Sequence, residues 1–234
     1  MRALGFVFAL LIVLVAVWPQ DDIRWRVTVQ LNTPQGVRTA SGVWALKVAD
    51  FRYHPRFSGE AIPLDLPDGR TVFALLVLRG ANQEPGPEVA MMVPHALWRR
   101  YGYRHLSKDS PARRIDYLKA HYRNVAIKLD CEPQSHLEAG ECPLLVSFPD
   151  PRKPGGVVAL DPNKVGAALG PGYSLRGVFA QITDDPPSHQ LGDRLPWLDG
   201  DWGRYLGLAS PAPQNSLARK LNDGSFRRWP QTRF

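Results

Sequence analysis

Cysteine is scarce in this chain, which has only Cys131 and Cys142 among its 234 residues. A zinc site needs more thiols, or histidines at paired spacing, so the sequence does not predict one. Ten residues separate the two cysteines. In an oxidising compartment such a pair forms a disulfide, which closes a small loop and stabilises the fold by about 3 kcal/mol. We therefore predict a Cys131–Cys142 disulfide, with two free thiols as the alternative.

Recognisable catalytic motifs are absent as well. The chain has no Ser-x-x-Lys pair, no H-E-x-x-H sequence and no phosphate-binding glycine loop. Ser174 lies between Gly172 and Gly177 and misses the G-x-S-x-G spacing of a nucleophile elbow by one position. These absences weaken an enzymatic interpretation without excluding it, because catalytic triads assemble in space and not in sequence. We predict no catalytic residue and no cofactor.

Charged residues are missing from the run between Ala3 and Trp18, which follows Met1 and Arg2. As a helix the run would span roughly 24 Å, which suits a short membrane anchor or a secretory signal. The residues before Pro19 lack the small-residue pattern of a signal-peptidase site, and no nearby cysteine permits lipoprotein processing. Trp18 stands where an interfacial aromatic residue would. We favour an uncleaved anchor and keep a cleaved signal as the alternative, because the run has no polar face for a buried amphipathic helix.

The chain after this run has strand and helix patterns. Apolar residues alternate with polar ones from Arg24 to Leu31, which predicts a half-buried strand. Turn residues separate it from further candidates at 37–48, 60–66 and 71–78, so we expect an antiparallel meander of about four strands. Later strands are predicted at 144–148, 157–160 and 175–183. Helices are predicted at 88–101, from Ser110-Pro111 onward, and within 161–170, where Asp161 would be the N-cap and Gly170 the terminator.

These patterns predict an α+β fold, mainly an antiparallel β-sheet domain with a few short helices. We divide the chain into an anchor or signal at 1–22, an extracytoplasmic domain at 23–185 and a C-terminal extension at 186–234. The extension is rich in proline and glycine and yet keeps several tryptophans. A disordered tail has few aromatic residues, so we expect the extension to pack irregularly on the domain.

Positive charge is concentrated between Arg99 and Lys128, where nine Lys or Arg residues face two Asp residues. This excess of +7 equals the formal charge of the whole chain. Aromatic residues are interleaved with it, and we predict a binding surface made of Trp98, Arg99, Arg100, Tyr101, Arg104, Arg113, Arg114 and Arg123. In a cytoplasmic protein this pattern would indicate nucleic acid. Outside the membrane we expect no nucleic acid, and the candidate partners are anionic lipid headgroups, an acidic envelope polymer or an acidic protein. The alternative is a solvated helix face near the membrane.

Two smaller clusters could bind metal or respond to pH. The disulfide loop carries the possible cation ligands Asp130, Glu132, His136, Glu138 and Glu141. A single histidine among exposed acids is more often solvated, so we predict no metal. The basic segment carries His95, His105 and His121, which could form a pH-sensitive surface. Helix capping or partial burial explains these histidines more simply.

Several segments resemble a family of uncharacterised bacterial proteins with an N-terminal signal or anchor and a periplasmic domain. The likeness is carried by WRVTVQLNTPQGVRTASGVWAL, by CPLLVSFPDPRKPGGVVALDPNKVGAALGPGYSLRGVFAQITDDP, and by RLPWL followed by NSL and FRR. It covers most of the predicted extracytoplasmic part of the chain apart from about residues 80 to 130. The family has no established activity, so the resemblance implies an address and a single domain but no catalytic residues.

The charge pattern predicts the cellular location of the protein, as the resemblance also does. Arg2 and the amino terminus favour the cytoplasmic side, which places the remaining chain outside. We expect a single-pass protein of the bacterial inner membrane with its domain in the periplasm, or a cleaved periplasmic form. We favour a binding component of the cell envelope that acts through the basic aromatic surface. The alternative is a periplasmic hydrolase with a spatially assembled site, which would need a pocket with a Ser or His beside a carboxylate.

Overall fold

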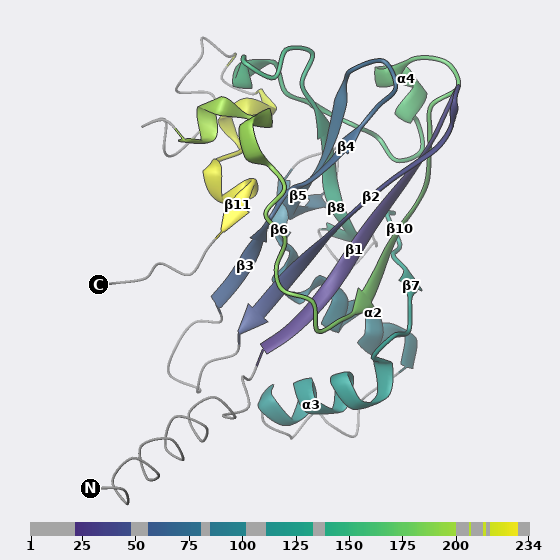
Figure 1. The fold of residues 1–234 in the computed structure, drawn as a ribbon, viewed down its shortest axis with the longest axis vertical. Helices are drawn as coiled ribbons and strands as arrows, with labels where there is room; N and C mark the ends of the chain where they lie inside the picture. The colour runs from purple at the N-terminus through teal and green to yellow at the C-terminus, as the bar shows by residue number, and fades with distance from the viewer. Residues whose placement is uncertain are drawn as a thin grey trace, which may run out of the picture.

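The computed structural model describes residues 22–47, 56–80, 85–101, 111–132, 139–199, 206, 213 and 216–228. These residues form two mainly antiparallel sheets with a few short helices, so the predicted α+β architecture is confirmed (Figure 1). The predicted N-terminal membrane segment lies outside the described residues, except for Asp22, which begins the first strand. Among the residues described, no helix combines the length and the apolar character needed to cross a membrane.

The first sheet is built around a long hairpin whose two strands have twelve residues each. Its order is β11-β3-β2-β1-β10-β7. The bounds are β1 Asp22–Thr33, β2 Gly36–Lys47, β3 Arg56–Glu60, β7 Ile127–Lys128, β10 Ser174–Ile182 and β11 Arg227–Arg228. The alternation predicted for β1 is confirmed, because every second residue from Trp25 to Leu31 is at most 1% exposed and the residues in between are half-buried. One side of this sheet therefore faces the core.

The second sheet lies against the first and has the order β4-β5-β8-β9, with β6 also paired to β5. The bounds are β4 Ile62–Asp65, β5 Thr71–Gly80, β6 Pro85–Glu88, β8 Ala139–Ser147 and β9 Val158–Ala159. The predicted single meander is wrong, because β1, β2 and β3 belong to one sheet and β4 and β5 to the other. The physical reason is that β5 is apolar on both faces. Leu76 packs toward the first sheet and Phe73 toward the opposite side, so this strand needs cover on both sides.

Three α-helices complete the described part of the fold: α2 Met92–Tyr101, α3 Pro111–Tyr122 and α4 Val165–Leu169. Pro94 is tolerated because it lies in the first turn of α2, where a missing N–H leaves no helical bond unmade. The prediction that Asp161 caps a helix is wrong. Its carboxylate accepts the Asn163 N–H at 3.1 Å and closes a turn, and α4 begins four residues later without a side-chain cap. Gly170 ends α4 as predicted, with φ of +102°.

C-terminal segments cover the outer face of the second sheet. They form short 3-10 helices at Gly192–Arg194, Pro196–Asp199, Leu217–Arg219 and Asp223–Ser225. Phe226 is fully buried there and lies 6.1 Å from Phe148 and 5.2 Å from Trp197 between ring centres. This aromatic packing explains how a segment without long helices or strands can shield a sheet face.

Candidate functional site

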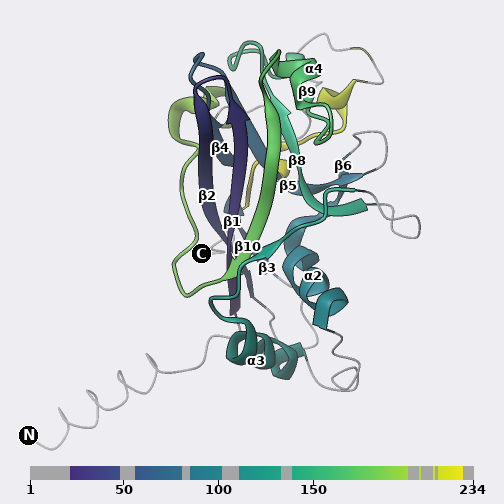
Figure 2. The same cartoon turned by 90° about the vertical axis from the view of Figure 1, so that its right-hand side faces the viewer.

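The helices α2 and α3 lie at the end of the molecule where β1 begins. Figure 2 shows α3 across that end with α2 beside it, whereas α4 and β9 lie at the other end. The Lys119 side chain of α3 donates a hydrogen bond at 3.0 Å to the backbone carbonyl of Asp22. The basic segment is therefore attached to the first residue of the domain. In the sequence, that residue follows the apolar run by four positions.

One face of α2 is buried and the other is exposed. Val93, Ala96 and Leu97 are at most 1% exposed and pack in the core between the sheets. On the other face, Trp98 is 37% and Tyr101 is 47% exposed. Trp98 and Tyr101 are three residues apart and lie on one side of a helix. Large aromatic side chains in such a solvent-facing position are a candidate contact surface.

Aromatic and basic side chains of the two helices meet at this exposed face. The Arg114 guanidinium lies 5.9 Å from the centre of the Trp98 ring. The rings of Tyr101 and Tyr122 are 4.7 Å apart. Further along α3, the ring of Tyr117 stacks on His121 at 4.0 Å. We define the α2–α3 surface as the set Trp98, Tyr101, Arg113, Arg114, Tyr117, His121 and Tyr122.

Three of the predicted binding arginines hold the helices to the sheets. Arg99 forms an ion pair with Glu141 of β8 at 2.6 Å. Arg100 donates to the backbone carbonyl of Lys128 in β7, and Arg123 pairs with Asp184 just after β10. Arg104 lies outside the described residues. The structure thus brings Trp98, Tyr101 and Arg114 together and gives the arginines at 99, 100 and 123 contacts within the fold.

The predicted disulfide between Cys131 and Cys142 is confirmed, with a Cα–Cα distance of 4.7 Å. Two buried charged side chains attach it to the rest of the molecule. Arg79 of β5 donates to the Cys131 carbonyl at 2.7 Å, and Glu141 accepts the Asp130 N–H at 3.0 Å. We call the two described segments that the Cys131–Cys142 disulfide joins the disulfide hairpin. Because Glu141 also pairs with Arg99, this hairpin and α2 are held in one polar network.

The acids of the disulfide loop do not assemble into a cation site in the described residues. Asp130 accepts the N–H of Glu132, and the Glu132 carboxylate binds the Asn163 side chain. Two other candidates, His136 and Glu138, lie outside the described residues, as does His105. Within the part of the chain that the structure describes, no group of three His, Cys, Asp or Glu residues could hold a metal.

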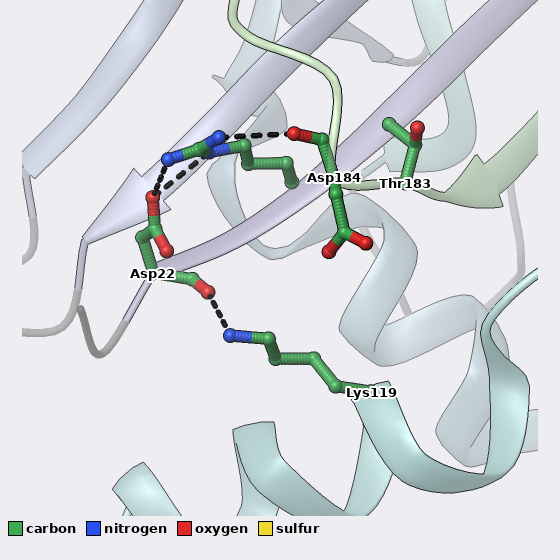
Figure 3. A pocket seen from close by; sticks show the side chains of 5 residues that line it. Asp22, Lys119, Thr183 and Asp184 are labelled. Carbon is green, nitrogen blue, oxygen red and sulfur yellow. Dashed lines mark hydrogen bonds and ion pairs between the residues drawn. The ribbon is translucent and has the colours of Figure 1, made fainter. Parts of the chain in front are cut away.

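A polar pocket lies at the Lys119 side chain of α3, and Figure 3 shows it. It is lined by Asp22, Arg24, Lys119, Thr183 and Asp184. Arg24 bonds to the Asp22 carboxylate at 2.6 Å and to the Asp184 carbonyl at 3.1 Å. This lining contains neither serine nor histidine, so the pocket lacks the pair of groups that the hydrolase alternative requires.

The Asp185 carboxylate beside this pocket also contacts other groups of the protein. The Thr183 hydroxyl and then the Arg26 guanidinium bond to Asp185 and hold its pKa below the ordinary value of 3.8. These contacts tie the chain after β10 to β1. They give this pocket a structural role in closing the end of the sheet.

Serine hydroxyls near histidine or in the glycine-rich loop also accept hydrogen bonds from within the fold. Ser188 accepts the Val43 N–H at 2.9 Å, although its neighbour His189 lies 3.8 Å from the Glu60 carboxylate. That carboxylate accepts the N–H groups of residues 190 and 191 through its other oxygen. Ser174 accepts the Asn32 amide at 2.9 Å. Each hydroxyl is thereby placed as an acceptor that joins strands or loops.

A second arginine–aromatic pair, which the sequence does not predict, lies at the other end of the first sheet. Arg70 lies over the Tyr173 ring at 5.4 Å, and both side chains bond to Asp68, at 2.5 and 2.6 Å. Arg70 also donates to the Leu169 carbonyl at 2.6 Å. The Arg70 and Tyr173 contacts hold the pKa of Asp68 well below its ordinary value, and the bond to Asp68 raises the pKa of Tyr173. We call these three residues the Asp68 cluster.

Comparison with known proteins adds no relative. The chain matches no protein-family model, no curated protein and no solved structure. The resemblance to uncharacterised bacterial proteins therefore stays a prediction.

Proposed function

We propose that this protein is a membrane-anchored, extracytoplasmic component of the cell envelope that binds an anionic partner through the α2–α3 surface. The observation that carries the proposal is the exposure of Trp98 and Tyr101 beside Arg114. Exposed aromatic side chains and arginines are the residues that most often supply binding energy at interfaces. Their position on two packed helices fixes them for a partner without a large ordering cost.

Charge supports an anionic partner. Of the described residues between Arg99 and Lys128, seven are Lys or Arg and one, Asp116, is acidic. Two acids from elsewhere, Glu141 and Asp184, pair with this segment. Even with all three acids counted, an excess of four positive charges remains. A net positive charge in this segment attracts anions and raises their association rate.

The cysteine pair and the N-terminal run support the proposed location at the membrane and outside the cytoplasm. A disulfide is compatible with an oxidising compartment such as the periplasm. Four residue steps from Trp18 to Asp22 span at most about 14 Å when extended. If the apolar run is retained in a membrane, α3 therefore lies close to that membrane, because Lys119 contacts Asp22.

The proposal is tested by charge reversal in the full chain. We expect Arg113→Glu with Arg114→Glu to reduce the partner recovered by crosslinking in intact cells by about tenfold or more, since one lost arginine contact is worth about 1.4 kcal/mol or more. Crosslinked material is purified from solubilised membranes and identified by mass spectrometry. The matched control is Arg38→Glu with Arg176→Glu, which changes the net charge equally on exposed residues at the other end of the first sheet.

Equal recovery of the partner from both double variants would overturn the proposal. Recovery of the wild-type protein in quantity with no crosslinked protein, polymer or lipid would favour the hydrolase alternative. In that case the purified protein would be screened for hydrolase activity. The free energy of unfolding of each variant is measured in parallel, so that loss of folding is not mistaken for loss of binding.

A further inference from the structure

We infer that the anionic partner is a lipid surface, and that the exposed side of α2 lies in its headgroup region. This inference rests on the proposed function and adds the class of partner. It starts from three exposed apolar side chains: Met91 at 44%, Trp98 at 37% and Tyr101 at 47%. Met91 lies one residue before α2, Trp98 follows it by seven residues and Tyr101 follows Trp98 by three, so the three side chains occupy neighbouring positions on the exposed part of the helix.

We call Met91, Trp98 and Tyr101 the stripe. The chemistry of these side chains suits a membrane interface. Tryptophan and tyrosine are enriched at headgroup level, because their rings are apolar and their N–H or O–H groups are polar. Arginines beside such a stripe bind lipid phosphates, and Arg113 and Arg114 lie on the adjoining helix. The stripe has apolar and aromatic residues toward one side and cations at its edge, as an interfacial helix does.

The aromatic rings of the stripe are held in place before any partner binds. Arg114 lies over Trp98, and Tyr122 packs 4.7 Å from Tyr101. The buried side of α2, with Leu97 1% exposed, fixes the helix on the core. Binding therefore requires little ordering of side chains, which favours contact with a surface that offers only weak individual interactions.

Position in the molecule favours a lipid surface over a soluble polymer or protein. The stripe lies at the end of the domain where β1 begins, next to the helix that contacts Asp22 (Figure 2). The short connection from Trp18 would hold this end at the membrane and give the helix surface a high effective concentration of headgroups. The polar pocket is lined by Asp22, Arg24, Lys119, Thr183 and Asp184, none of which belongs to the α2–α3 surface.

The test places tryptophan side chains relative to lipid headgroups. The full chain is labelled with 5-fluorotryptophan and reconstituted in nanodiscs of equal parts phosphatidylcholine and phosphatidylglycerol with a trace of gadolinium-chelating lipid. The fluorine resonance of Trp98 is assigned by its loss in Trp98→Phe. We expect this resonance to broaden several-fold more than that of Trp197, which packs on Phe148 under the C-terminal segments.

Two comparisons test the charge requirement. Broadening of the Trp98 resonance should fall in discs of phosphatidylcholine alone and in the variant Arg113→Glu with Arg114→Glu. It should persist in Arg38→Glu with Arg176→Glu. Equal broadening in both kinds of disc would overturn the inference of an anionic lipid partner.

Failure of this inference differs from failure of the proposed function. If the Trp18 resonance broadens and that of Trp98 does not, the chain is in the disc and the α2–α3 surface does not contact lipid. The proposed function then stands only if crosslinking still recovers a partner that the arginine variants lose. If neither the crosslinking nor the broadening of the Trp98 resonance depends on Arg113 and Arg114, the proposed function fails as well.

Discussion

Two arginine–aromatic pairs lie at opposite ends of this molecule and differ in their surroundings. At one end Arg70 lies over Tyr173, and at the other Arg114 lies over Trp98, at 5.4 and 5.9 Å. Tyr173 is 9% exposed and bonds to the carboxylate that also binds Arg70, whereas Trp98 is 37% exposed. The same side-chain pairing thus closes a turn onto a loop at one end and leaves an accessible surface at the other.

This contrast shows which surroundings give an arginine–aromatic pair a structural role and which leave it available for binding. In the Asp68 cluster the Asp68 carboxylate accepts hydrogen bonds from both Arg70 and Tyr173. The bond from Tyr173 joins chain segments 105 residues apart. On the α2–α3 surface the aromatic ring keeps a large solvent-accessible area. Variants that weaken each end separately test whether the two pairs differ in this way.

The largest effect is expected from removing the disulfide beside the helical end. Cys131→Ala with Cys142→Ala should lower the free energy of unfolding by about 3 kcal/mol, because the unfolded chain gains conformational freedom. Denaturant unfolding of the oxidised wild type and of the double variant measures this difference. Hydrogen exchange should accelerate in β8 and α2 more than around Asp68, since Glu141 joins the disulfide hairpin to Arg99. Unchanged stability would show that the disulfide does not support this end.

A smaller effect is expected from the buried carboxylate in the same network. Glu141→Ala should cost about 2 kcal/mol, because it leaves the Asp130 N–H without its acceptor and Arg99 without its ion pair. The matched control is Glu132→Ala, an exposed acid in the same hairpin, for which we expect a change within about 0.5 kcal/mol. Thermal and denaturant unfolding of both variants test this. Equal losses would mean that burial of Glu141 does not determine its contribution.

At the opposite end we predict a modest, pH-dependent contribution from Asp68. Asp68→Asn should cost about 1 kcal/mol near neutral pH, because the side chain is partly exposed and its ion pair with Arg70 is partly screened. The pKa of Asp68 is lowered in the folded state, so its contribution is present above the ordinary value of 3.8 and is lost as the pH falls below it. The stability difference between wild type and variant should therefore shrink between about pH 5 and pH 2. A difference that stays constant would contradict the assignment.

Local patterns in the sequence predict the parts of the fold that depend on neighbouring residues. Alternation predicts β1, the Ser-Pro pair predicts the start of α3, and the spacing of the cysteines predicts the disulfide. Each signal lies within about a dozen residues, so no knowledge of the tertiary structure is needed. The predicted membrane segment lies outside the described residues, apart from Asp22.

Long-range pairing limits what the sequence predicts about the site. The aromatic and basic composition indicates the α2–α3 surface, but it does not show that Arg99 and Arg123 pair with Glu141 and Asp184. Those acids lie 42 and 61 positions away in the sequence and reach the helices only through the sheets. The Asp68 cluster escapes prediction for the same reason. The two-sided burial of β5 could have been noticed, because Val72 to Leu78 is continuously apolar.

The smallest effect compares one conservative substitution at each end. Arg114→Lys keeps the charge and loses the planar stack on Trp98, so the free energy of unfolding should fall by less than about 0.5 kcal/mol. Arg70→Lys should cost about 1 kcal/mol, because lysine cannot hold both Asp68 and the Leu169 carbonyl as the guanidinium does. Denaturant unfolding measures both, and crosslinking measures partner recovery. If Arg70→Lys reduces partner recovery as much as Arg114→Lys does, the two ends do not differ in function. If only Arg114→Lys reduces recovery, its stacked guanidinium contributes to binding beyond its charge.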